Sequence, residues 1–374
     1  MSIATLAFWL AVAFVAYTYV GYPLIVRLLA GRGDEPAPPQ PASWPSVTVV
    51  VAVHDEASRI PRKLESLRAQ DYPGLVTLLF VSDGSTDGTE ALLRTQPDVR
   101  TFAYAPRRGK PAALNAAMAE VDTELVVFTD VRQPLEASAI RRLVARLLQP
   151  GVGAVSGELI HVEPGNRVAA SVGLYWRYEK AIRKAESRIA STVGVTGALY
   201  CIRSADFEPL APDTLLDDLI VPMRIARRGK RVLLEPGAIL YDELQTETAG
   251  ERKRKVRTLT GNFQAIASEP WLLSPTANPL FVQFVSHKLF RLFVPYAIVV
   301  AFVAALAADG AFYHAMAAIQ AALLLGALGG LASARLRAQR LFGFLAVFAE
   351  LNFAAVLALR EFVAGRMDAR WEKT

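Results

Sequence analysis

The sequence has almost none of the residues on which disulfide frameworks and zinc clusters depend. Its 374 residues include one cysteine, Cys201, and four scattered histidines. One cysteine excludes an intrachain disulfide and leaves too few thiolates for a zinc cluster. Charged residues make up only 20% against 53% hydrophobic residues, so the chain is neither disordered nor highly charged. The net charge of +6 fits an anionic partner, such as lipid, sugar phosphates or nucleic acid.

Charge is absent from the first 26 residues. An apolar run of this length can hold a membrane span of roughly 20 residues. The first basic residues, Arg27 and Arg32, follow the run, whereas a cleavable signal peptide has its positive charges in front. We therefore expect residues 1–30 to form an uncleaved anchor with its N-terminus outside, and residues 31–45 a proline-rich linker. A buried core helix is the alternative.

A second apolar region begins near Pro279. Over residues 279–291, apolar and polar side chains recur at helical spacing, which predicts an amphipathic helix at the membrane surface. Residues 292–360 contain two expected spans and a third candidate, at 293–308, 311–332 and 341–359.

The third candidate contains Glu350. A carboxylate inside a membrane is a functional hypothesis by default, and contact with neighbouring helices is the alternative that we favour. If residues 341–359 cross the membrane, the basic tail over 361–374 lies outside, against the positive-inside rule. The number of C-terminal spans, two or three, and the side of the C-terminus therefore stay open.

Residues 46–268 alternate between short apolar runs and helical patterns. We expect strands at 47–53, 76–81 and 124–129, and helices at 57–69, 85–94 and 111–119. This alternation predicts an α/β fold with a doubly wound, mostly parallel sheet and right-handed crossovers. Ligands of such sheets bind at the carboxyl ends of the strands.

The residues that follow these strands are polar and acidic. They include His54 and Glu56 after the first strand, Asp83 after the second and Asp130 after the third. Neither GxGxxG nor GxxxxGK[ST] occurs there, which excludes Rossmann dinucleotide and Walker-type sites. Carboxylates at these positions suit hydrogen bonds to a base and ribose, or a divalent cation on a diphosphate. For Asp83 and Asp87, ordinary turn chemistry is the alternative.

Four segments occur in a fixed order along this domain. They are VTVVVAVHDEASRI (47–60), FVSDGSTDGTEALL (80–93), RRGKPAALNAA (107–117) and LVVFTDVRQ (125–133). Together they resemble the family 2 glycosyltransferases of the GT-A type, whose fold is Rossmann-like, over roughly residues 46–265. The apolar ends resemble the membrane-bound branch that includes cellulose, chitin, hyaluronan and poly-N-acetylglucosamine synthases. The resemblance implies transfer of a sugar from a nucleotide diphosphate sugar, commonly UDP-linked, with inversion at the anomeric carbon.

The resemblance also implies which residues bind the nucleotide sugar. They are His54, Glu56, Asp83, Lys110, Asp130, Arg254 and Arg257. Asp130 matches the first position of the family's Asp-Xaa-Asp motif, which holds Mg²⁺ or Mn²⁺. The third position is Arg132, so metal dependence stays open.

Catalysis and acceptor binding are implied for two later segments. An inverting transfer needs a base for the acceptor hydroxyl proton, and a carboxylate beside a like charge has a suitably raised pKa. Asp218 is our choice for this base, with Asp217 in support; an acidic pair that only stabilises a helix N-terminus is the alternative. The small-residue loop with Gly194, Thr196 and Gly197 resembles the segment that approaches the acceptor.

The densest positive charge lies at residues 252–257. Processive relatives have a Gln-Xaa-Xaa-Arg-Trp motif here, whereas Arg257 is followed by Thr258. The missing Trp argues against processive synthesis. We expect Arg254 and Arg257 to face the diphosphate and Arg252 to face anionic lipid, together with Lys253.

We therefore expect a multi-pass protein of the inner or plasma membrane with a cytoplasmic catalytic domain. It would act in polysaccharide biosynthesis for the cell envelope, on a lipid-linked or saccharide acceptor. Its expected partners are membrane lipid and either further copies of itself or an export protein. Two alternatives remain: an inactive glycosyltransferase-like membrane subunit, and a membrane-anchored nucleotidyltransferase. Nucleic acid is not expected as a partner, because the basic run is single and lacks interleaved aromatic residues.

Overall fold

The soluble part of the protein is built on one seven-stranded sheet, with the strand order β3-β2-β1-β4-β6-β5-β7. A computed structural model describes residues 2–31, 33, 36–162, 167–243, 248–366, 368 and 370, without the side chains of 167–175, 243 and 248–251. The strands are β1 (Val47–Val53), β2 (Val76–Asp83), β3 (Val99–Tyr104), β4 (Leu125–Thr129), β5 (Val152–Val162), β6 (Leu199–Arg203) and β7 (Arg231–Glu243).

The sheet is mostly parallel, as predicted. β1 pairs in parallel with β2 and β4, and β6 is the one strand among the described residues that runs antiparallel, to β4 and to β5. β5, β6 and β7 have no counterpart among the strands predicted from the sequence, and neither has β3. It is an edge strand that mixes polar and apolar residues, so it lacks the continuous apolar run of a central strand.

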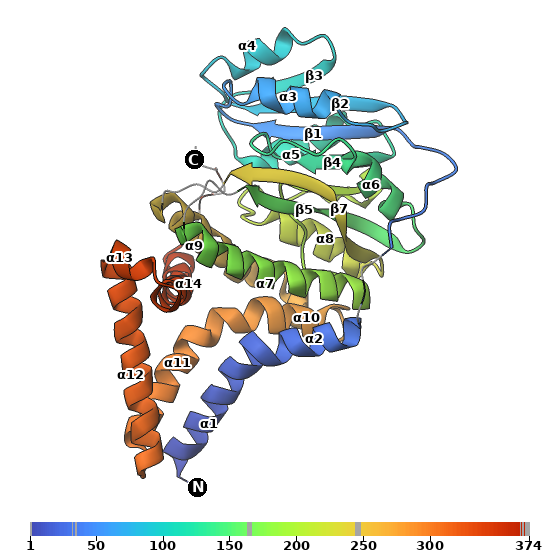
Figure 1. Cartoon of the computed structure of the whole chain (residues 1–374). Coiled ribbons are helices and arrows are strands. Elements are labelled where there is room, and N and C mark those ends of the chain that lie inside the picture. The colour runs from blue at the N-terminus through green and yellow to red at the C-terminus, as the bar shows by residue number, and fades with distance from the viewer. Residues whose placement is uncertain are drawn as a thin grey trace.

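Helices cover both faces of the sheet (Figure 1). They are α3 (Ile60–Arg68), α4 (Thr89–Arg94), α5 (Lys110–Glu120), α6 (Ala139–Leu147), α7 (Arg167–Ile189), α8 (Asp217–Arg227) and α9 (Thr248–Ser268). Alternate residues of β1 belong to opposite cores: Val49 clusters with Ile60 and Leu64, and Val50 clusters with Leu114. A strand buried on both faces must be apolar throughout, which is why the sequence located β1 at its observed bounds.

Within the described part of the chain, four helices are long and apolar enough to cross a membrane: Ile3–Ala30, Phe281–Ala307, Ala311–Ala332 and Arg340–Val363. The first comprises α1 (Ile3–Ala16), a π-helical segment (Tyr17–Gly21) and α2 (Tyr22–Ala30). The second comprises α10 (Phe281–Phe284), a π-helical segment (Val285–Leu289) and α11 (Phe290–Ala307). The third is α12 (Ala311–Ala332) and the fourth is α14 (Arg340–Val363), which the short helix α13 (Ala334–Arg337) precedes. Two sequence-based segments fall partly outside the described residues: Arg32 and Asp34 of the linker, and Lys373 of the basic tail.

The segment expected to be a separate surface helix is continuous with the next span. Residues 281–307 form one helix, and its polar side chains contact the soluble domain. The ring of His287 lies 2.8 Å from Glu186 and 3.0 Å from Glu179, both on α7, and Arg291 pairs with Glu179. These contacts join the helix to α7, so its polar face is occupied by protein.

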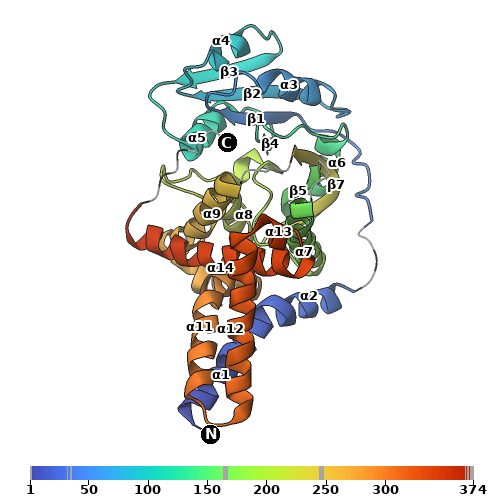
Figure 2. The same cartoon turned by 60° about the vertical axis from the view of Figure 1, so that its left-hand side comes forward.

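α14 has a direction of its own. α1, α11 and α12 extend away from the sheet, whereas α14 appears end-on in Figure 1 and lengthwise across them in Figure 2. Its C-terminal half packs on α9, where the rings of Phe263 and Phe362 stack at 5.9 Å. Glu350, on the same helix, forms an ion pair of 2.8 Å with Arg337.

Candidate active site

Asp83 ends β2 and is completely buried. Its two carboxylate oxygens accept the backbone N–H groups of Arg108 at 2.6 Å and Gly109 at 2.8 Å. In this structure Asp83 therefore shapes the loop that leads into Lys110, at the first turn of α5. The predicted contact with the nucleotide base is a separate role that these two bonds do not test.

The residues after β1 lie beside this loop. His54 Nδ1 lies 2.7 Å from the backbone oxygen of Asp83, and Glu56 forms an ion pair of 2.8 Å with Arg59. Asp87 accepts the backbone N–H of Thr89 at 3.0 Å, at the start of α4. The alternative of turn chemistry thus describes Asp87, and it accounts for α4 starting four residues later than expected.

Lys110 brings two of the predicted acidic sites together. Its Nζ atom lies 3.1 Å from Oδ1 of Asp130, after β4, and 3.3 Å from Oδ2 of Asp217, at the start of α8. Burial by itself lowers the pKa of this ammonium, but Asp130 and Asp217 outweigh it and raise the pKa. Lys110 is therefore a fixed positive charge between the metal-motif position and the acidic pair.

Asp218 has the electrostatics of a base. Burial, followed by the negative charge of Asp217, raises its pKa to about 6, while Lys110 opposes the shift. A carboxylate with this pKa is ionised at neutral pH and still binds a proton well enough to accept one in a reaction. The catalytic role that the sequence predicts for Asp218, with Asp217 in support, stays a prediction.

The predicted acceptor loop closes over Asp218. The backbone N–H of Val195 donates to the backbone oxygen of Asp218 at 2.9 Å. A Cβ atom at Gly197 would lie 3.0 Å from Oδ2 of Asp218, and Gly194 has φ +85°. Only glycine allows this backbone to approach the carboxylate so closely.

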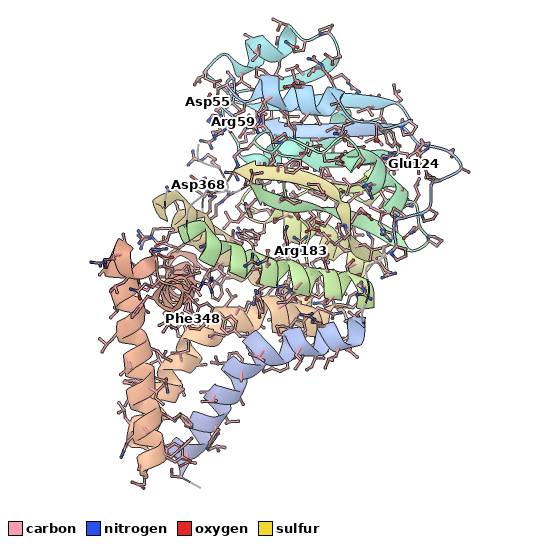
Figure 3. All side chains as sticks on the ribbon, in the orientation of Figure 1. Asp55, Arg59, Glu124, Arg183, Phe348 and Asp368 are labelled. Atoms are coloured by element: carbon pink, nitrogen blue, oxygen red, sulfur yellow. The ribbon has the colours of Figure 1, made fainter. Side chains whose placement is uncertain are left out.

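Arg183 is a functional candidate that the sequence did not reveal. From α7 it donates to Oγ1 of Thr196 at 3.0 Å and to Oγ of Ser156 at 2.9 Å (Figure 3). Burial lowers the pKa of this guanidinium, with nearby carboxylates including Glu186 opposing the shift. Its signal in the sequence is weak, because an isolated Arg on a charged helix gives no indication of its partner.

Arg254 and Arg257 lie on α9, which is anchored beside the acidic pair. The backbone of Gly261 packs so closely on Leu216 that an added Cβ would lie 2.5 Å from its side chain. Arg254 and Arg257 precede Gly261 by seven and four residues, so they share its helical face. This face packs on Leu216, the residue before Asp217, and the expected contact of both arginines with the diphosphate stays a prediction.

The positive charge of Arg132, at the third position of the metal motif, is neutralised by a carboxylate on another strand. Arg132 lies 2.6 Å from Asp242 of β7, which also accepts from Gln133 at 3.2 Å. Among the described residues, no group of three or more His, Cys, Asp or Glu side chains could hold a metal ion. Asp130, at the first position of the motif, could contribute one carboxylate to a cation that takes most of its ligands from a substrate diphosphate and water.

Lys63 is a second residue that the sequence analysis missed. It is fully buried on α3 and donates to Oγ1 of Thr129 and to the backbone oxygen of Gln133, both at 2.8 Å. Burial lowers its pKa to about 7, and Asp130 opposes the shift. Its position between Ile60 and Leu67 on the apolar face of α3 was the available signal. Lys63 supports the strand end and the turn on either side of Asp130.

Part of the chain is similar to a known protein family. Residues 48–206 match the model of glycosyl transferase family 2. An N-acetylglucosaminyltransferase of Azorhizobium caulinodans is 26% identical over 217 residues, which cover 52% of this chain and 54% of that protein. A pre-mycofactocin glycosyltransferase of Mycobacterium tuberculosis is 26% identical over 228 residues, 59% of this chain and 47% of that protein. This chain thus matches about half the length of either relative.

A solved structure shares the whole architecture. The mannosyltransferase PcManGT from Pyrobaculum calidifontis, in complex with GDP-Man and Mn²⁺, has a TM-score of 0.74 and 24% sequence identity. The match covers 96% of this chain and 99% of that chain, and it shows that the two proteins have the same fold. The sheet and the site at its carboxyl edge agree with the match of residues 48–206 to glycosyl transferase family 2, and the fold is of the GT-A type.

Proposed function

We propose that this protein is an inverting glycosyltransferase that moves a sugar from a nucleotide diphosphate sugar to an acceptor hydroxyl beside the membrane. One observation carries this proposal: Lys110 lies within 3.3 Å of both Asp130 and Asp217, next to an Asp218 whose pKa is raised to about 6. A fixed cation and a tuned base are what such a transfer requires.

The proposed step balances as a single displacement. The acceptor oxygen attacks the anomeric carbon, and the bond from that carbon to the diphosphate oxygen breaks. Asp218 takes the hydroxyl proton, and the nucleoside diphosphate leaves with the electron pair. Lys110 and Arg257 supply positive charge for the leaving group, which gains negative charge as the bond breaks.

A divalent cation fits this site only through Asp130 and the substrate. Mg²⁺ or Mn²⁺ bound there would neutralise charge on the diphosphate as the bond to the sugar breaks. Lys110, already beside Asp130, provides a permanent part of that charge, and Arg132 is held away by Asp242. We therefore propose that a metal ion assists the reaction without being its only source of positive charge.

The donor that we propose is a UDP-sugar, in line with the family resemblance and with the N-acetylglucosaminyltransferase relative. A GDP-linked mannose is the second candidate, because the structural neighbour is described in complex with GDP-Man. Loss of the stacking Trp at Thr258 favours transfer of a single sugar over processive synthesis.

We also propose that α1, α11 and α12 cross the membrane, while α14 lies along its surface under the catalytic domain. Arg27, Arg335 and Arg340 lie near the ends of these spans that face the catalytic domain, as the positive-inside rule requires of a cytoplasmic side. With α14 along the surface, the basic tail stays on that side and the conflict with the rule disappears. The soluble domain extends over residues 46–268, between β1 and the end of α9.

The test is a donor panel on purified full-length protein. Release of nucleoside diphosphate would be followed for UDP-glucose, UDP-N-acetylglucosamine, UDP-galactose and GDP-mannose with a membrane lipid extract, in Mg²⁺, Mn²⁺ or EDTA. We expect turnover of one donor that is lost in Asp218→Asn and retained in Asp213→Asn, an exposed carboxylate of the same segment. Nucleotide binding without turnover of any donor would favour the inactive-subunit alternative. Release of inorganic diphosphate from a nucleoside triphosphate and a sugar phosphate would favour a nucleotidyltransferase.

A further inference from the structure

A buried polar cluster joins α7 to the helix of residues 281–307, and the reaction described above does not use it. His287 and Glu186 are each only 1% exposed. Nδ1 of the His287 ring lies 2.8 Å from Oε1 of Glu186, and Nε2 lies 3.0 Å from Oε2 of Glu179. Tyr22 of α2 donates to the same oxygen of Glu186 at 2.5 Å. One histidine of a membrane-length helix therefore contacts two carboxylates of α7.

The chemistry of this cluster is more than the fold needs to hold two helices together. Burial raises the pKa of Glu179, but Arg291 and then His287 outweigh it and hold that pKa well below its ordinary range. Glu179 is therefore an ionised acceptor for both side chains. Well-packed apolar residues often join two helices as stably as buried charges do. His287 also lies in the π-helical segment Val285–Leu289, and such segments occur frequently at functional sites.

Arg183 lies between the two carboxylates on α7. It follows Glu179 by four residues and precedes Glu186 by three, and side chains at this spacing are neighbours on a helix. These two carboxylates are the first of those that oppose the lowering of its pKa by burial. Figure 1 shows α7 between the sheet and the helices α2 and α10, and Figure 3 labels Arg183 on it. About two turns of α7 therefore carry both the membrane-helix contacts and the arginine of the acceptor loop.

The acceptor loop is fixed at Thr196, next to the candidate base. Arg183 donates to the hydroxyl oxygens of Thr196 and Ser156, and the backbone N–H of Thr196 donates to Oγ of Ser156 at 2.8 Å. The next residue, Gly197, is the one whose added Cβ would lie 3.0 Å from Oδ2 of Asp218. A shift of Thr196 would therefore move the backbone that lies against the base. A misplacement of about 1 Å in an active site can cost about a hundredfold in rate.

From this geometry we infer that His287 is a positioning residue for the acceptor loop. Through the two carboxylates of α7 it fixes the turns that carry Arg183, and Arg183 holds Thr196. The position of a membrane-length helix is thereby transmitted to the loop beside Asp218. The inference deepens the proposed function and rests on it for the roles of the acceptor loop and of Asp218.

Two conservative variants divide the contact of His287. The amide of Gln can donate near the position of Nε2 and that of Asn near the position of Nδ1, so His287→Gln and His287→Asn each keep one carboxylate bond. In full-length protein in detergent, with the donor and acceptor that the panel identifies, we expect each to lower kcat about fivefold or more and to leave the KM for the donor unchanged. Ser286→Ala, which removes the hydroxyl next to Tyr17 of the first membrane-length helix, should change kcat less than about twofold. An unchanged kcat in both His287 variants, or a rise in donor KM, would overturn the inference.

A double variant tests whether His287 acts through Arg183. If it does, His287→Gln/Arg183→Met loses little more in kcat than Arg183→Met alone, because the loop is already released. Independent roles would instead multiply the two losses, and that result would contradict the inference. Thermal unfolding of the same proteins is the control for stability, since a contact that only stabilises the fold leaves the kcat of the folded protein unchanged.

Hydrogen exchange separates this inference from the transferase proposal, because it needs no donor. The N–H groups of Val195 and Thr196 donate to Asp218 and Ser156, so their exchange reports whether the loop is held. We expect a peptide over residues 193–198 to exchange about threefold or more faster in His287→Gln and in Arg183→Met, with α4 unchanged. Faster loop exchange without turnover of any donor would leave the positioning role standing and overturn the transferase. Donor turnover with unchanged loop exchange in the His287 variants would do the reverse.

Discussion

The ammonium of Lys110 lies 3.3 Å from the carboxylate of Asp217, although 107 positions separate the two residues along the chain. The same ammonium lies 3.1 Å from Asp130, so one cation connects the first position of the predicted metal motif to the acidic pair. This contact makes the ionisation of Asp218 dependent on Lys110, because Lys110 lowers the pKa that burial and Asp217 raise.

Replacing Lys110 by Ala should therefore change both donor binding and the base. We expect kcat/KM to fall by about a hundredfold or more, since a charge that stabilises the leaving group is lost. The acid limb of the pH profile should also move upward, because the pKa of Asp218 rises without its cation. Arg108→Ala removes an exposed charge two residues away and serves as the control. An unshifted acid limb in the Lys110 variant would show that the base is not coupled to it.

The wild-type protein should lose activity as the pH falls through about 6, the pKa of Asp218. A base must be ionised to accept a proton, so activity is complete above this pH and declines below it. A profile of kcat/KM between pH 4.5 and 8.5, which brackets this pKa, tests the assignment. A midpoint near 4, the ordinary value for Asp, would contradict the proposed environment.

Asp218→Asn should stabilise the fold while abolishing transfer. A raised pKa means that the native state binds the proton more tightly than the unfolded state, so ionisation of Asp218 destabilises the protein above about pH 6. The amide removes this charge, and we expect a gain on the order of 2 kcal/mol at pH 8 that disappears below about pH 4. Thermal unfolding of both proteins at the two pH values measures it. A loss of stability at pH 8 would indicate that the ionised carboxylate is held by favourable contacts instead.

Arg183 should act as a positioning residue for the acceptor loop. Its loss in Arg183→Met releases Thr196, so we expect kcat to fall by about tenfold to a hundredfold with little change in the KM for the donor. Arg183→Lys should recover part of kcat, since one donor can still reach Ser156 or Thr196. Lys184→Ala, the next residue on α7 and an ion-pair partner of Glu158, is the control. A parallel rise in donor KM would instead place Arg183 at the nucleotide.

The pair of Arg132 and Asp242 should behave as a unit. Arg132→Ala leaves the carboxylate of Asp242, only 9% exposed, without its closest cation, and we expect a loss of about 2 kcal/mol in the free energy of unfolding. The double variant Arg132→Ala/Asp242→Asn should recover most of this loss. Denaturant unfolding of the two single variants and the double variant measures the coupling. Additive losses would show that the two side chains stabilise the protein independently.

Local patterns were enough to locate much of this protein from its sequence. A strand buried on both faces must be apolar at every position, so Val47–Val53 could be recognised without knowledge of its partners. Carboxylates at strand ends were likewise visible, because position along the chain determines which edge of a parallel sheet they occupy. The adjacent pair Asp217 and Asp218 was found only through the resemblance to a known family. Four apolar stretches of membrane-spanning length could be read in the same way.

Contacts between distant segments were decided only by the tertiary structure. Lys63, Arg183 and Asp242 act through partners that lie 13 to 110 positions away, and no local pattern specifies such a partner. The nucleotide contact expected of Asp83 stays a prediction, and the two backbone N–H groups that its oxygens accept could not be read from the sequence. Composition marks α14 as a membrane span, but its packing on α9 sets its direction across the other helices. Sequence periodicity shows which face of a helix or strand is buried, because apolar side chains gather on that face. Only the tertiary structure shows which other residues the buried face contacts.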